Sequence, residues 1–188
     1  MNPSNRRHAH VFEDHLVVLV RPRYPENVGA VARAMRVTGF RQLVLVAPHP
    51  LADPAHPQAA KMAVGSVDIL AQARVVESLV EVTQDADLLV ATTARRGVSG
   101  VVSSRSLGPL LLAQSRAGKR VALVFGGERA GLRKAEVDAC PIACRIPMVG
   151  NEPSLNLSQA VMVVLYELLV TALGEAEVSG MACPMGKE

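Results

Sequence analysis

Short apolar runs alternate with amphipathic segments along most of the chain. Uninterrupted apolar runs are typical of strands that are covered on both faces of a sheet. Strands that alternate with helices predict an α/β fold with a mostly parallel sheet and helices on both faces. The predicted strands are His15–Val20, Gln42–Val46, Asp87–Thr92, Val121–Phe125 and Pro141–Ile146.

The segments between these runs carry helix signals. Asn27 is expected to cap a helix that ends at Gly39. Ser78 and Glu81 have the spacing of a capping box. A further helix is predicted at 107–117, ahead of the fourth strand.

The last predicted helix, residues 156–173, is apolar around most of its circumference. Such a helix must be buried on more than one side, and a second subunit is expected to cover one of them. We therefore divide the chain into a flexible tail at 1–14, one domain at 15–173 and a C-terminal tail at 174–188. No apolar run approaches the roughly 18 residues of a membrane span, and residues 1–14 lack a secretory signal, so a cytoplasmic protein is expected.

Charge and composition limit the classes of molecule that the protein is expected to bind. The net charge of +3 and the basic pI near 9.0 permit a nucleic-acid partner, while an aromatic fraction of 3% leaves few rings for stacking bases. Phosphate contacts should therefore dominate any RNA binding. Cys140, Cys144 and Cys183 are an odd set, which predicts buried thiols and not a disulfide framework. A metal site at His49 and His56 is a weaker alternative, and no metal is expected.

Ligands of parallel sheets lie beyond the carboxyl ends of strands, so three strand-end loops are candidate sites. After the first strand, Arg21, Arg23 and Arg33 surround a helix start, which suits a phosphate; a capped helix with solvated arginines explains the same residues. After the fourth strand, adjacent glycines precede Glu128, and a simple turn is the alternative. After the fifth strand, Ser154 leads into the last helix.

Together the three loops resemble the motifs of the SpoU/TrmH group of SPOUT methyltransferases. The matching residues are Asn27-x-Gly29-x-x-x-Arg33, Phe125-Gly126-Gly127-Glu128-x-x-Gly131-Leu132, and Ile146-Pro147-Met148 followed by Ser154-Leu155-Asn156-Leu157-Ser158. The run Thr92-Thr93-Ala94-Arg95 is similar to the TrmJ-like branch, which methylates a ribose in the tRNA anticodon loop. The resemblance spans nearly the whole chain.

This resemblance implies a C-terminal deep trefoil knot, a homodimer with an active site shared between protomers, and S-adenosylmethionine as cofactor. The implied activity is 2′-O-ribose methylation of RNA, with tRNA as the expected substrate. The implied catalytic residues are Arg33, Asn27, Glu128, Ser154 and Asn156. The implied cofactor contacts are Thr92, Thr93, Ala94, Gly126, Ile146, Pro153, Ser154 and Leu155. RNA is expected to meet Arg21, Arg23, Arg95, Arg96 and Arg129.

Two departures from the family pattern bear on function. Gly127 stands where the family usually has Asn or Arg, and few residues follow the last helix, where TrmJ-like enzymes often carry an extension. The alternatives are therefore an rRNA 2′-O-methyltransferase or an inactive RNA-binding module. A nucleotide-linked oxidoreductase is disfavoured because G-x-G-x-x-G is missing after the first strand.

Overall fold

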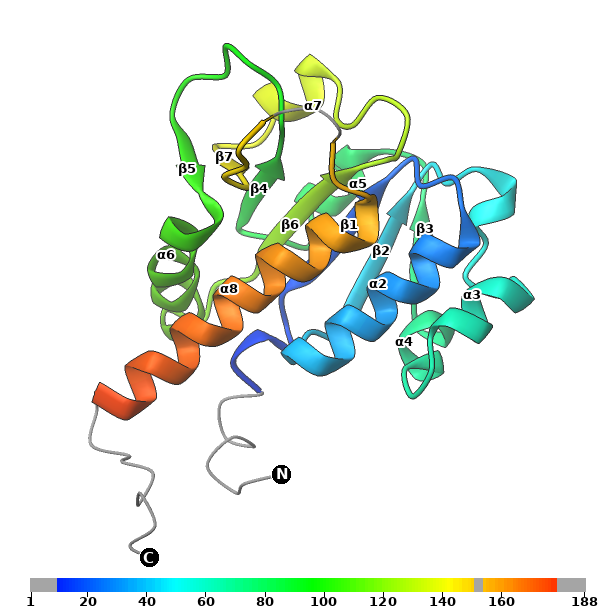
Figure 1. Ribbon diagram of the computed structural model, residues 1–188, viewed down its shortest axis with the longest axis horizontal. Coiled ribbons are helices and arrows are strands. Elements are labelled where there is room, and N and C mark those ends of the chain that lie inside the picture. Colours follow the sequence, from blue (N-terminus) through cyan, green and yellow to red (C-terminus); the bar gives the residue numbers. More distant parts are fainter. Residues whose placement is uncertain (1–9, 151–153, 179–188) are drawn as a thin grey trace, which may run out of the picture.

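The computed structural model describes residues 10–150 and 154–178, which fold around one seven-stranded parallel sheet (Figure 1). The strand order is β3-β2-β1-β6-β4-β7-β5. β6 therefore lies between β1 and β4, and β7 lies between β4 and β5, so each joins two strands that precede it in the chain. The strands are β1 (Leu16–Val20), β2 (Gln42–Val46), β3 (Arg74–Val76), β4 (Leu88–Thr92), β5 (Val101–Ser103), β6 (Val121–Gly126) and β7 (Ile142–Arg145).

Both faces of the sheet are covered, as the sequence predicted. Along β1, Val17 and Leu19 join one apolar cluster while Val18 and Val20 join the other, because side chains alternate across a strand. The helices α2 (Pro25–Thr38), α6 (Ser104–Arg116) and α8 (Leu157–Val178) contribute to the first cluster, and α5 (Leu79–Thr83) and α7 (Lys134–Asp138) contribute to the second.

All five predicted strands are present, but two edge strands were missed. β3 and β5 are three residues long, too short to show a pattern in the sequence. The proline-rich loop also holds more structure than expected: the 3-10 helix η2 (Pro50–Ala52) is followed by the short helices α3 (Pro57–Met62) and α4 (Val67–Ala71).

The ordered domain extends beyond the boundaries that we expected. A 3-10 helix, η1 (His10–Phe12), lies within the segment assigned to a flexible tail. Phe12 is fully buried and stacks on Phe40, with the ring centroids 5.0 Å apart. At the other end, α8 continues to Val178 and not to residue 173.

The helix α2 begins three residues earlier than predicted. Pro25 occupies the first turn, where its fixed φ favours a helix start, and Tyr24 takes the N-cap position without a side-chain cap. The expected capping role of Asn27 is therefore wrong, and its side chain is available for other contacts. The predicted end at Gly39 is confirmed, since Gly39 has φ 89°.

The long helix α8 is apolar enough to be mistaken for a membrane span. Leu157–Gly174 has a mean hydropathy of 1.7 and sufficient length, although polar residues such as Gln159 and Glu167 interrupt its apolar residues. The helix packs on α2 and α6. Its Glu167 also pairs with Arg105 of α6 at 3.4 Å. These contacts are those of a core helix in a folded domain.

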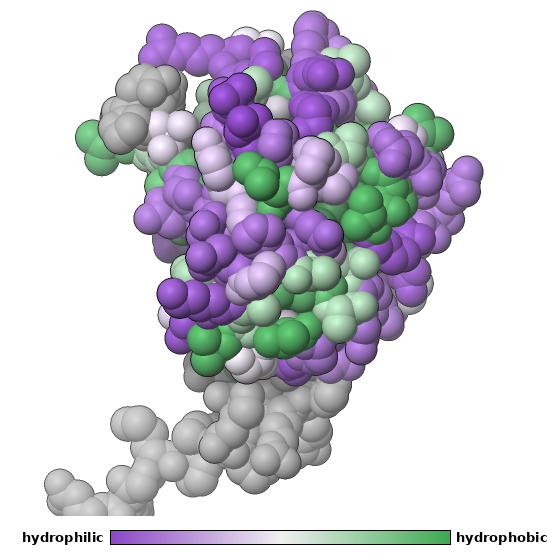
Figure 2. Space-filling view, turned by 90° about the vertical axis from the view of Figure 1, so that its right-hand side faces the viewer, coloured by the Kyte–Doolittle hydropathy of each residue, from purple (hydrophilic) through white to green (hydrophobic). Residues whose placement is uncertain are grey.

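The face around α3 and α4 carries several exposed apolar side chains. Figure 2 shows this side of the molecule, where apolar groups are interrupted by hydrophilic ones. The exposed apolar residues in this part of the chain are Leu51, Met62, Val64, Val67 and Val75. They form separate groups and not one continuous patch.

His15 lies at the amino ends of the strands, where it is buried and hydrogen-bonds to β6 and α6. Its Nδ1 accepts a hydrogen bond from the Val121 amide at 3.2 Å, and its Nε2 lies 2.5 Å from the Ser115 hydroxyl. Because Nδ1 accepts, the ring proton resides on Nε2. Burial lowers the pKa of His15 to about 4; Asp14 opposes this shift and Arg120 adds to it.

Candidate active site

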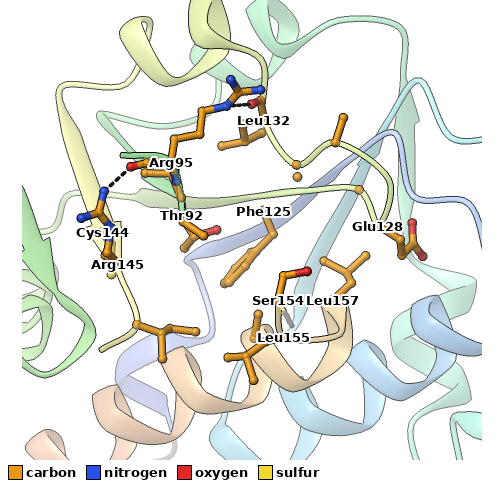
Figure 3. A pocket seen from close by; sticks show the side chains of 18 of the residues that line it. Thr92, Arg95, Phe125, Glu128, Leu132, Cys144, Arg145, Ser154, Leu155 and Leu157 are labelled. Atoms are coloured by element: carbon orange, nitrogen blue, oxygen red, sulfur yellow. Dashed lines mark hydrogen bonds between the residues drawn. The ribbon is translucent and has the colours of Figure 1, made fainter. Parts of the chain in front are cut away.

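A cavity of about 460 Å³ opens at the carboxyl ends of β4, β6 and β7, beside the start of α8 (Figure 3). Phe125, Leu132 and Leu157 give it an apolar floor, while four arginines lie around it. Those arginines are Arg95, Arg96, Arg129 and Arg145. This size and this mixture of surfaces are typical of small-molecule sites.

The predicted cofactor residues gather at this cavity. Those that line it are Thr92, Thr93, Ala94, Gly126, Ile146, Ser154 and Leu155. Pro153 lies outside the described residues. The Thr92 hydroxyl donates to the Val124 carbonyl at 2.9 Å, and the Thr93 amide donates to the Cys144 carbonyl at 2.9 Å. The end of β4 is therefore fixed to both neighbouring strands.

Glu128 connects the three motifs. One carboxylate oxygen accepts from the Arg23 amide at 2.9 Å, and the other accepts from the Tyr24 amide at 3.4 Å and from Asn27 Nδ2 at 2.6 Å. Asn27 Oδ1 in turn accepts from Asn156 Nδ2 at 3.0 Å. A single hydrogen-bond chain thus joins the β1–α2 loop, the loop after β6 and the start of α8.

Asn156 also caps α8. Its Oδ1 accepts from the Ser158 amide at 2.9 Å, which is the hydrogen bond of a helix N-cap. Capping and the contact with Asn27 use different atoms of the same side chain. The start of α8 is therefore oriented toward the β1–α2 loop.

Two arginines connect the loops on the other side of the cavity, as Figure 3 shows. Arg95 Nε donates to the Leu132 carbonyl at 2.9 Å, and Arg145 donates to the Arg95 carbonyl. The Nε of Arg145 is buried and has no hydrogen-bond partner within the described part of the chain. A buried donor beside a cavity is available to a bound molecule.

Arg21, predicted to meet RNA, makes a bidentate ion pair with Glu136 of α7 and also donates to the Gly131 carbonyl at 3.2 Å. The hydrogen bond to Glu136 raises the pKa of Arg21. Burial alone would raise the pKa of Glu136, but hydrogen bonds from Arg21 and the Arg133 amide bring it below its usual value. Much of the charge of Arg21 is therefore balanced within the protein.

The unusual Gly127 has a steric explanation. A Cβ at this position would lie 2.1 Å from the Arg21 carbonyl oxygen, and the Gly127 amide donates to the Val20 carbonyl at 2.8 Å. At Gly126, a Cβ would lie 2.1 Å from the Leu132 nitrogen. Both glycines allow the loop after β6 to lie against neighbouring backbone. Gly29 serves a similar purpose against α3, where its Cβ would meet the Ala59 oxygen at 2.1 Å.

Arg33 does not join the cavity in its own chain. It is exposed on α2 and is absent from the lining both of this cavity and of the second cavity described below; among the described residues it forms no hydrogen bond or ion pair. Arg96 and Arg129 are exposed as well, and both line the cavity. Arg23 is half-buried and lies 6.0 Å from the centre of the Tyr24 ring.

A second cavity of about 320 Å³ lies beside the first, at the ends of β1, β2 and β6. Its lining residues are Arg21, Arg23, Ala47, His49 and residues 127–131. His49 and His56, considered above as metal ligands, each cap a short helix through the ring nitrogen Nδ1. The described residues contain no group of three or more His, Cys, Asp or Glu side chains that would suit a metal ion.

The two described cysteines are buried thiols, as the sequence predicted. Burial raises the pKa of Cys144 to about 12 and that of Cys140 to about 11, so both remain protonated near neutral pH. Cys144 lines the first cavity, but a protonated thiol is a poor nucleophile. The geometry therefore suits binding and orientation of reactants more than covalent catalysis by the protein.

Sequence reasoning missed Arg145 and Glu136. Arg145 is the last residue of β7 and lies one position before the end of the predicted fifth strand, so the strand-end argument applied to the other loops would have found it. Glu136 lies in a short helix, and its partner Arg21 is 115 positions away. No local sequence pattern predicts an ion pair between residues so far apart in the chain.

The chain is similar in sequence and in structure to several known proteins. The chain is 40% identical over 154 residues to the TrmJ tRNA (cytidine/uridine/adenosine-2′-O-)-methyltransferase of Pseudomonas aeruginosa, an alignment that covers 81% of this chain and 59% of that protein. A probable methyltransferase from Bordetella pertussis superposes with a TM-score of 0.81 and 33% identity, over 87% of this chain and 99% of that one. An AdoMet-bound rRNA methyltransferase from Sinorhizobium meliloti superposes with a TM-score of 0.67 and 26% identity, over 89% and 59%.

The first curated relatives are longer than this chain, which spans 59–66% of their length. The family itself is clear from a sequence match that covers most of the domain. The SpoU rRNA Methylase family matches residues 14–166, which contain all three motifs. The chain therefore belongs to the SpoU rRNA methylase family.

Proposed function

We propose that the protein is an S-adenosylmethionine-dependent RNA 2′-O-ribose methyltransferase of the cytoplasm that acts on the anticodon loop of tRNA. The observation that carries this proposal is the hydrogen-bond chain through Glu128, Asn27 and Asn156, which brings the three motifs together beside one cavity. The similarity to a TrmJ tRNA methyltransferase supports tRNA as the substrate.

The first cavity fits the cofactor. Its apolar floor suits an adenine ring, and the buried Nε of Arg145 offers a donor to a hydroxyl or carboxylate group. Thr92, Thr93, Ala94 and Ile146 would hold the cofactor on one side and Leu155 on the other. When bound, S-adenosylmethionine supplies a methyl group that is activated by its sulfonium. The Sinorhizobium meliloti structure, which has AdoMet bound, supports this assignment.

The protein's own contribution is orientation. Glu128 accepts hydrogen bonds from the amides of Arg23 and Tyr24. Asn27 connects Glu128 to Asn156 and so holds the start of α8 beside this loop. Ser154 and Asn156 would then place the ribose hydroxyl beside the cofactor. Holding reactants in line supplies a large share of the rate in such a transfer.

We assign Arg33 to the neighbouring protomer's site in a homodimer. It is exposed and lines neither of the two cavities of its own chain described above. Met162, Tyr166 and Val170 repeat every four residues on α8 and are 36%, 54% and 45% exposed, which supplies an apolar face for a second copy. An arginine side chain stays protonated, so Arg33 is proposed to orient a phosphate next to the target ribose and not to act as a base.

We also propose that the C-terminal part of the chain forms a deep trefoil knot. The insertion of β6 and β7 between earlier strands supports this topology, because the chain must return through the sheet region after β5 is in place. Such threading is an exception to the usual rule for connections.

Two alternatives share the same fold. An rRNA substrate is favoured by the Sinorhizobium meliloti relative, which is an rRNA methyltransferase. An inactive RNA-binding module was suggested by Gly127, but the steric fit of this glycine gives it a structural purpose.

The deciding experiment is transfer of labelled methyl from S-adenosylmethionine to tRNA and, separately, to rRNA, with nuclease mapping of ribose-methylated dinucleotides. A mark in the tRNA anticodon loop is expected. Methylation of rRNA alone would identify rRNA as the substrate. Absence of S-adenosylmethionine binding would favour the inactive RNA-binding module.

A further inference from the structure

The second cavity has no assigned role in the chemistry above. It is separated from the first cavity by one short loop, because residues 127–131 line both. A ligand in the second cavity would therefore lie directly beside the reaction site but on the other side of this loop. The loop is narrow, since the Gly131 amide donates to the Gly127 carbonyl at 3.0 Å.

The charge of this second cavity is positive. Arg21 is balanced by Glu136, as described above. Arg23 and Arg129 contribute two further positive charges, and Glu128 contributes one negative charge whose two oxygens accept hydrogen bonds from the β1–α2 segment. One positive charge remains in excess, on arginines that have no ion pair within the described ranges.

His49 adds a donor to the same cavity. Its Nδ1 accepts from the Leu51 amide at 3.2 Å, so a neutral ring carries its proton on Nε2. The loop that holds it is anchored to the β1–α2 loop, because the His49 amide donates to the Pro22 carbonyl at 2.9 Å. The proline-rich loop after β2 thus presents a fixed imidazole among the arginines.

Two residues of the cavity wall have unusual backbone conformations. Arg21 has φ 54° and Ala47 has φ 44°, both in the left-handed region that disfavours residues other than glycine. They follow Val20 and Val46, which pair in the sheet, so two adjacent strand ends turn in the same way. Such conformations cluster at ligand sites, where surrounding structure maintains them.

We propose that the second cavity binds a phosphodiester of the RNA backbone, next to the nucleotide whose ribose enters the first cavity. Arg23 and Arg129 supply the charge, and His49 supplies a hydrogen bond from Nε2. This assignment rests on the proposed RNA substrate and adds a specific subsite to it, including a residue outside the three motifs. The loop of residues 127–131 then separates the cofactor from the flanking phosphate.

The test measures RNA binding alone, without cofactor, as a function of salt concentration. Arg129→Gln is expected to weaken tRNA binding about tenfold and to reduce the slope of log affinity against log salt by about 0.7 to 0.9, the value for one lost phosphate contact. His49→Asn keeps an acceptor that caps the short helix but removes the Nε2 donor. We expect it to weaken binding about threefold with little change in slope, since a neutral donor releases few ions.

Lys119→Gln is the matched control. Lys119 is exposed directly before β6, at the opposite edge of the sheet, and its loss removes the same charge. The subsite is overturned if Arg129→Gln and Lys119→Gln change the salt slope equally, or if Arg129→Gln alters only the affinity for S-adenosylmethionine. Because binding is measured without methyl transfer, a wild-type protein that binds tRNA but transfers no methyl group refutes the proposed activity and leaves the subsite open to this same test.

Discussion

The carboxyl ends and the amino ends of the parallel strands use polar side chains in opposite ways. At the carboxyl ends, Glu128, Asn27 and Arg95 connect separate loops, and these loops surround two cavities. At the amino ends, His15 bonds to Val121 and Ser115 and is only 2% exposed. The side of the sheet at the carboxyl ends is therefore open to ligands, and we call it the open edge. The side at the amino ends is closed, and we call it the closed edge.

This difference predicts which substitutions should affect activity and which should affect stability. Apart from the buried Asn27, the groups at the open edge are half-buried or exposed, so their loss should alter activity more than stability. Groups at the closed edge contact only the protein, so their loss should alter stability with little direct effect on binding. Four changes break or sharpen this division.

Arg33→Ala should have the largest effect on activity, and it tests a residue that belongs to neither edge in its own chain. We expect methyl transfer to fall on the order of 100- to 1000-fold while cofactor affinity stays unchanged, because a charge that orients the substrate is lost. Single-turnover methyl transfer and calorimetric binding of S-adenosylmethionine measure the two effects. Full activity in the variant would remove Arg33 from the mechanism.

A mixture of chains sharpens that experiment. If Arg33 serves the partner's cavity, Arg33→Ala chains mixed with Glu128→Ala chains regain about a quarter of wild-type activity, because half of the random dimers contain one intact site. Mixtures that remain inactive would place Arg33 and Glu128 in the same chain's site.

Glu128→Ala tests the hydrogen-bond chain at the open edge. Three donors lose their acceptor, and the β1–α2 loop is free to move, so activity should fall on the order of 100-fold. The free energy of unfolding should fall by about 1 to 3 kcal/mol, as for other half-buried donors left unpaired. Glu77→Ala, which removes an exposed carboxylate that lines neither cavity, is the control. Equal activities of the two variants would contradict the assignment of Glu128.

Arg145→Met tests the opposite wall of the first cavity. The variant loses the donor to the Arg95 carbonyl and the buried Nε, while keeping much of the apolar stem. We expect cofactor affinity to fall about tenfold, in line with the loss of a charged hydrogen bond, and RNA affinity to change little. Arg105→Met, which removes an exposed arginine from α6, should leave both affinities unchanged. A loss of RNA affinity alone would assign Arg145 to the substrate.

The open edge could be predicted from the sequence because its residues follow apolar strands directly. Thr92, Gly126 and Ile146 each lie at the end of a clear strand, and the parallel sheet brings those ends together. The strands β1, β2, β4 and β6 were equally plain, since each contains at least four consecutive apolar residues, whereas β7 contains three.

The remainder depends on contacts that no local pattern encodes. Asn27 was expected to cap a helix, but Pro25 moved the start of α2 and left Asn27 to join Glu128, 101 positions away. Arg21 was expected to contact RNA, but α7 brings Glu136 against it. Pairings over such separations are determined by the packing of whole elements, which short motifs do not describe.

The closed edge gives the smallest expected effect, and it appears only in acid. The pKa of His15 is lowered to about 4 in the folded protein, against 6.5 for a free histidine, so the unfolded chain binds more protons between these values. Stability from this group is therefore complete above pH 6.5 and declines by up to about 1.4 kcal/mol per pH unit as the pH falls toward 4. His15→Asn keeps an acceptor for the Val121 amide but does not titrate. Denaturant unfolding at pH 7 and pH 5 should show a smaller loss of stability for the variant than for the wild type, with methyl transfer at pH 7 nearly unchanged; equal losses at pH 5 would mean that other groups determine the acid sensitivity of this edge.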